Sequence, residues 1–63
     1  MQVIALNHDP ITNTFAAIMR DQNGNEVHVR GSLTLPGTAT GDEIKKRALA
    51  EVKIILGVAA ASL

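Results

Sequence analysis

The side chains that could transfer a proton or hold a metal ion are few and lie apart in the sequence. His8 and Asp9 are adjacent at a turn signal, and His28 stands alone between two valines. Adjacent side chains of an extended chain point to opposite faces, so His8 and Asp9 need not meet. We interpret them as a surface imidazole and a turn former. With no cysteine and no carboxylate cluster, two histidines do not define a metal site.

The hydroxyl and glycine residues show no catalytic pattern either. Ser32 and the threonines have no base at a recognisable spacing, and the sequence contains no nucleophile-elbow motif. The five glycines do not form a phosphate-binding loop. We therefore expect a protein that is not an enzyme, with no catalytic residue, no metal and no cofactor.

The basic side chains fall into two groups. The first lies on alternate positions of predicted strands, on their polar face, and consists of Arg20, His28 and Arg30. The second is the only basic run, Lys45, Lys46 and Arg47. A solvated helix face with local salt bridges explains that run. The alternative is a partner or anion face with a basic flank, for nucleic acid or for a small anionic ligand held between protomers.

Three segments are predicted to be strands and one a helix. Residues 2–7, 12–20 and 26–35 are rich in β-branched and aliphatic side chains, and turn signals separate them. Residues 41–61 carry apolar side chains at helical spacing. The expected fold is α+β (βββα): a three-stranded antiparallel β-meander followed by one long C-terminal α-helix packed on one sheet face. Residues 1–63 form a single domain in this interpretation.

The second hairpin has a predictable register. The order Asp21-Gln22-Asn23-Gly24 is typical of a type I turn closed by a glycine bulge. That turn pairs Arg20 with Glu26 and Met19 with Val27, whereas a two-residue loop would slip one apolar set off the shared face. The predicted apolar face consists of Phe15, Ala17, Met19, Val27, Val29 and Leu33, which Ile4 and Leu6 can join.

The helix carries two apolar stripes. Thr40 and Glu43 have capping-box spacing, and one stripe from Ile44 to Ala59 should cover the sheet. A second stripe lies roughly opposite and consists of Ala50, Ile54, Gly57, Val58 and Ala61. Because a helix that is apolar all round is expected to be buried all round, we predict that this stripe is an oligomer interface. The alternative is that Gly57 ends the helix and the tail folds back or frays.

The composition favours a protomer of something larger. The chain has 63 residues, 46% of them hydrophobic, yet Phe15 is its only aromatic residue. Chains this short rarely bury enough apolar area alone. Six basic and six acidic residues balance, which argues against a polybasic nucleic-acid binder, and no membrane span or signal peptide is expected. We expect a cytoplasmic, homo-oligomeric interaction protein of phage or mobile-element type that binds itself and another protein, with nucleic acid a less favoured partner.

Overall fold

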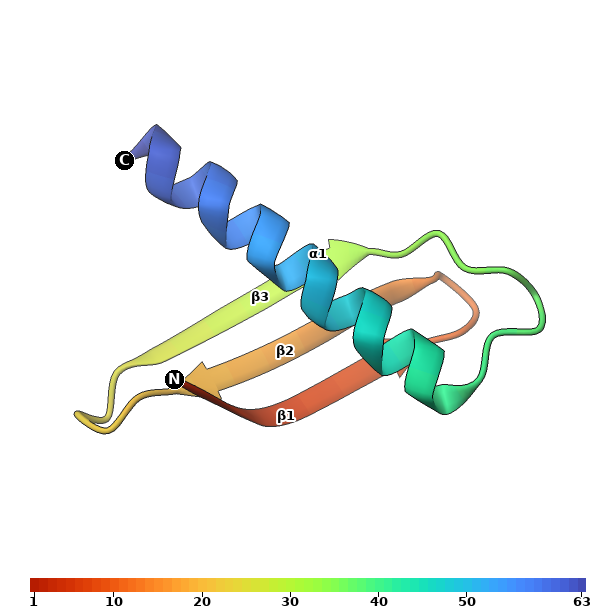
Figure 1. Cartoon of the computed structure of the whole chain (residues 1–63), viewed down its shortest axis with the longest axis horizontal. Helices are drawn as coiled ribbons and strands as arrows, with labels where there is room; N and C mark the ends of the chain where they lie inside the picture. Colours follow the sequence, from red (N-terminus) through yellow and green to blue (C-terminus); the bar gives the residue numbers. More distant parts are fainter.

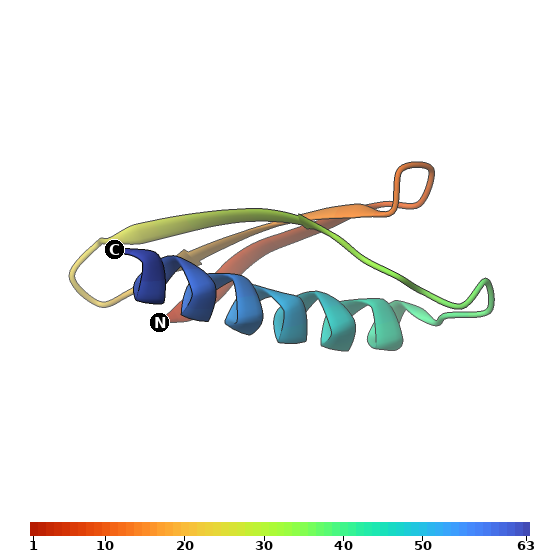
Figure 2. The same ribbon diagram turned by 90° about the horizontal axis from the view of Figure 1, so that it is seen from above.

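The computed structural model describes residues 1–63 as an open antiparallel sheet and one helix (Figure 1). The strands are β1 (Gln2–Asp9), β2 (Thr14–Arg20) and β3 (Glu26–Ser32), which lie in the order β1-β2-β3, and the helix is α1 (Gly41–Ser62). Figure 2 shows α1 as a second layer on one side of the sheet. The predicted α+β class and βββα order are confirmed. The helix is not apolar enough over a sufficient length to cross a bilayer.

The first hairpin turn lies two residues later than predicted, because the predicted strands leave residues 8–11 between them and the observed strands leave residues 10–13. Strand β1 continues to Asp9, which pairs with Thr14, and the four residues 10–13 form the turn. The Asp9 carboxylate accepts a hydrogen bond from the Ile11 N–H at 2.9 Å, and Asn13 adopts φ 53°, a left-handed conformation that asparagine tolerates. As a result, β2 begins at residue 14 rather than 12. Strand β3 ends at Ser32 instead of 35, because β2 offers no partner beyond that point.

The second hairpin has the predicted register. Arg20 pairs with Glu26 and Met19 with Val27. Gly24 has φ 84°, as a glycine bulge requires, and its N–H donates to the Asp21 carbonyl at 3.3 Å. The Asp21 carboxylate also accepts the Asn23 and Asn25 N–H groups at 2.8 and 2.9 Å. The turn residues therefore fix the pairing of β2 with β3.

The register of β1 shifts within its first half. Between Val3 and Ala5 a β-bulge interrupts the ladder, so Val3 pairs with Met19 while Leu6 pairs with Ala17. Leu6 joins the helix-facing side as predicted. The expectation for Ile4 is wrong, because the bulge places Val3 rather than Ile4 opposite Met19, and Ile4 is 46% exposed.

The core lies between the sheet and the first half of α1. It consists of seven buried residues: Phe15, Ala17, Met19, Val29, Leu33, Ala48 and Val52. The helix begins where predicted, and the Thr40 hydroxyl accepts the Glu43 N–H at 3.3 Å. Gly31 lies opposite Phe15, and a Cβ atom there would be 2.8 Å from Phe15 Cε1 and 2.9 Å from Ile55 Cδ1. The helix, the ring and the strand therefore meet at Gly31.

The last turns of α1, from Gly57 onward, are exposed and lie beyond the core. No residue after Val52 is buried, and Figure 1 shows the C-terminal half of the helix passing beyond β3. The helix runs through Gly57 to Ser62 without a break. The alternative of a C-cap at Gly57 with a folded-back tail is therefore wrong.

Candidate functional site

The polar end of the open sheet face is built around one carboxylate. Arg20 and Glu26 are cross-strand partners, and the Arg20 Nε donates to Glu26 Oε2 at 2.8 Å while its Nη2 forms an ion pair with the same oxygen. His28 lies two residues further along the same face, with its Nε2 3.3 Å from Glu26 Oε1. Two of the three side chains predicted to hold an anion thus share a carboxylate of their own chain, which leaves Arg30 without an ion pair.

Arg20 and His28 act on the protonation of Glu26. The hydrogen bond from Arg20 lowers the pKa of Glu26 most, the His28 contact lowers it further, and the charge of Arg20 adds to both. Because this pKa lies below its ordinary value of 4.5 in the folded chain, Glu26 contributes to stability above pH 4.5. That contribution is lost as the pH falls through the lowered pKa.

We expect Arg20→Met to raise the pKa of Glu26 toward 4.5, because the main hydrogen bond to its carboxylate is removed. An NMR titration of the Glu26 side-chain carbon measures this change directly. Arg30→Met is the matched control, since Arg30 is exposed on the same face and forms no ion pair. An unchanged Glu26 titration in Arg20→Met would contradict the assignment.

A shallow groove lies beside Arg30 on the open face. Ala16 pairs with Asn7 on one side and Arg30 on the other, so a small side chain lies between two longer ones. The groove has a volume of about 480 Å³, and Ser32 and Asp9 also line it. It offers a guanidinium and several hydrogen-bonding groups. No group of three His, Cys, Asp or Glu side chains is placed to hold a metal ion.

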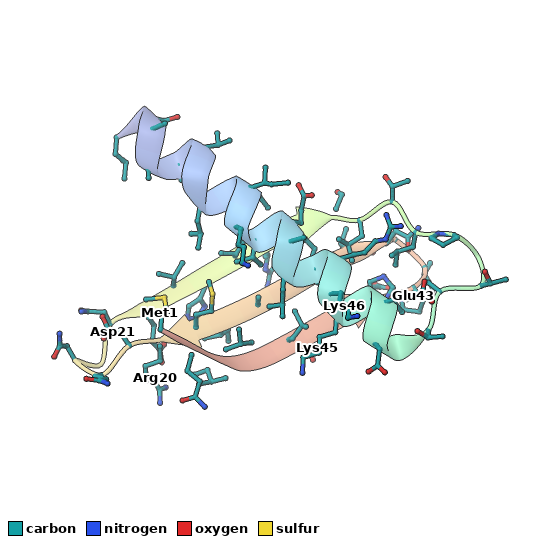
Figure 3. All side chains as sticks on the ribbon, in the orientation of Figure 1. Met1, Arg20, Asp21, Glu43, Lys45 and Lys46 are labelled. Carbon is teal, nitrogen blue, oxygen red and sulfur yellow. The ribbon has the colours of Figure 1, made fainter.

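The second basic group lies on the helix, whereas the first lies on the sheet. Lys45, Lys46 and Arg47 are exposed on the first turns of α1, and none forms an ion pair. Figure 3 shows Lys45 and Lys46 beside the first turns of the helix, well away from Arg20 near the second hairpin. Lys46 and Arg47 border a second shallow hollow with Ser32. Lys45 and Lys46 are thus separated from Arg20, whereas Arg30 and Arg47 each border a hollow that includes Ser32.

His8 lies in a different place from the one predicted. It pairs with Phe15 on the helix-facing side, and its Nε2 is buried without a hydrogen-bond partner. The interpretation as a surface imidazole is wrong, because β1 runs through His8 and alternation from Leu6 turns its side chain inward. The imidazole borders a small hollow with Ile44 and Lys45. The spacing of His8, two residues after the apolar Leu6 on one strand, is the sequence signal that predicts an inward side chain.

The helix tail presents an exposed apolar surface. We define the outer stripe as the predicted interface residues, all of which are exposed: Ala50, Ile54, Gly57, Val58 and Ala61. Ile54 is 58% and Val58 63% exposed. A cation near a helix C-terminus would be favourable, yet the last turn contains no basic residue. The stripe is thus both apolar and free of the charges that usually cover a solvated helix end.

The two layers of the fold thus display different surfaces. The open face is polar around Glu26 and Arg30, and the opposite layer ends in an exposed apolar helix. The chain matches no protein-family model, and comparisons with curated proteins and with solved structures find no significant relative.

Proposed function

We propose that this chain is a small, non-enzymatic interaction protein that associates with itself through the outer stripe and acts by binding another protein. One observation carries the proposal: the tail of α1 leaves the sheet while its side chains remain apolar (Figure 1). Exposed apolar patches of this kind mark protein–protein contacts. The absence of cysteine is compatible with a reducing compartment such as the cytoplasm.

The composition of the outer stripe suits contact with a second helix. Gly57 and Ala61 are small and one helical turn apart, so another backbone can approach closely between Ile54 and Val58. A Cβ atom at Gly57 would meet nothing within 4 Å, so packing inside this chain does not require glycine there. Close packing of a second helix against this position would explain why a glycine is present there.

Sedimentation velocity over a range of concentrations tests the proposal. The wild-type chain should sediment as a dimer or larger species, whereas Ile54→Lys combined with Val58→Lys should weaken this association at least about tenfold. Ala60→Lys is the matched control, because Ala60 is exposed on the same turn but lies off the stripe. A wild-type monomer of 6.7 kDa at every concentration would overturn the proposal.

Nucleic acid is the competing partner, and it is tested separately. Since Glu26 neutralises part of the basic face, we expect no salt-sensitive binding to generic DNA or RNA at low salt. If the chain binds DNA or RNA, and this binding weakens steeply with salt and is lost in Arg30→Glu, then the partner is a nucleic acid rather than a protein.

A further inference from the structure

The outer edge of β3 is a regular, unprotected strand edge. The Asp21 N–H donates to the Asn25 carbonyl and the Leu33 N–H to the Asn13 carbonyl, so odd-numbered residues of β3 bond to β2. The N–H and C=O groups of Glu26, His28 and Arg30 therefore face outward. All seven residues of β3 keep one register, with neither proline nor bulge. Natural proteins usually block such an edge.

The other edge of the sheet is protected. Strand β1 contains the bulge between Val3 and Ala5, and Pro10 follows its last residue. Bulges and prolines are common devices that prevent edge pairing. Of the two edges, only β3 is ready to accept another strand along its whole length.

The helix extends over the place that an added strand would occupy. Leu56 is half-buried on the sheet-facing side of α1, and Ala59 and Leu63 follow it at helical spacing but are exposed. Figure 1 shows this part of the helix beyond β3. A strand added at β3 would lie beneath these residues. It would cover the apolar, sheet-facing side of the tail, which a single chain leaves exposed.

We propose that β3 pairs antiparallel with β3 of a second copy of this chain, around a two-fold axis at His28. This contact is distinct from the outer stripe, which lies on the far side of the helix, and it goes beyond the proposed function. The pairing would form about six backbone hydrogen bonds between the copies and join two sheets into one.

Charge complementarity favours this register over pairing about Arg30. Pairing about His28 places Glu26 opposite Arg30 of the second copy, twice by symmetry. Arg30 has no ion pair in its own chain, and Glu26 Oε1 has only the 3.3 Å contact with His28. Pairing about Arg30 would instead set two guanidinium groups against each other, which is unfavourable for directly opposed residues.

Disulfide crosslinking tests the register, because the chain has no cysteine of its own. In His28→Cys the two thiols would face each other across the axis, within the Cα separation that a disulfide allows. We expect it to crosslink on mild oxidation at least about tenfold faster than Ser32→Cys. Ser32 is the matched control, since it lies on the same exposed edge but far from the axis. Equal rates would overturn the proposal.

The same measurement separates this contact from the outer stripe. The crosslink at residue 28 should persist in the Ile54→Lys/Val58→Lys background if β3 pairs independently. In that background His28→Pro should give a folded monomer, because proline there removes only an outward N–H. Dimers that survive His28→Pro in this background would refute β3 self-pairing, even if the outer stripe is confirmed. A peptide of another protein that pairs with β3, while two copies of this chain do not pair there, would also refute it.

Discussion

Replacing Phe15 with alanine is expected to cost about 3–5 kcal/mol of unfolding free energy and to leave the isolated chain largely unfolded at 25 °C. Phe15 is the only aromatic residue and is 3% exposed at the centre of a seven-residue core. Ala17 and Ala48 in the same core are small, so the neighbouring side chains should fill the cavity only in part.

Urea denaturation followed by circular dichroism measures this loss. The chain should be studied at low concentration, since self-association would add to its apparent stability. Ile11→Ala is the control: Ile11 is 93% exposed in the first turn, and its truncation should change the free energy by less than about 0.5 kcal/mol. A Phe15→Ala variant as stable as Ile11→Ala would contradict the assigned core.

The second large effect is expected at Gly31. Gly31→Ala should destabilise the chain by about 1–3 kcal/mol, because its Cβ would overlap the buried Phe15 ring. Ile55 Cδ1, 2.9 Å away, is the end of a flexible side chain and can move, whereas the ring is buried in the core. The ring, rather than the helix, therefore sets the cost.

A double-mutant cycle isolates this clash. In a Phe15→Leu background the smaller side chain leaves room, so the penalty of Gly31→Ala should fall by at least half. Gly37→Ala serves as control, since a Cβ atom there meets nothing within 4 Å. If the penalty is the same in the wild-type and Phe15→Leu backgrounds, steric contact with the ring is not its cause.

Local residue types were sufficient to predict the order of elements and the second hairpin. Asp21 and Gly24 define a turn whose geometry allows one register, and the apolar alternation of Val27 and Val29 agrees with it. The capping residues at Thr40 likewise fix the start of the helix. Where turn chemistry and alternation agree, tertiary contacts have little left to decide.

The remaining features depend on contacts that a sequence pattern does not contain. Residues 3–6 are all apolar, so alternation could not locate the bulge that moves Ile4. His8 was assigned by its neighbours Asp9 and Pro10, although its side chain follows Leu6 inward. The cross-strand pair of Arg20 and Glu26 was predicted, but the sharing of that carboxylate with His28 depends on side-chain orientation.

The contact between Phe15 and Gly31 also provides a spectroscopic reporter of the folded state. An aromatic ring shifts the resonances of protons held close to it, and Phe15 is the only ring of that size in the chain. One Gly31 α-proton points toward the Phe15 ring, in the direction in which a Cβ atom would lie 2.8 Å from Cε1. Its displaced signal would therefore disappear on unfolding, so that proton spectra of the unlabelled protein can follow the docking of β2, β3 and α1 in a chain with no tryptophan or tyrosine to provide fluorescence.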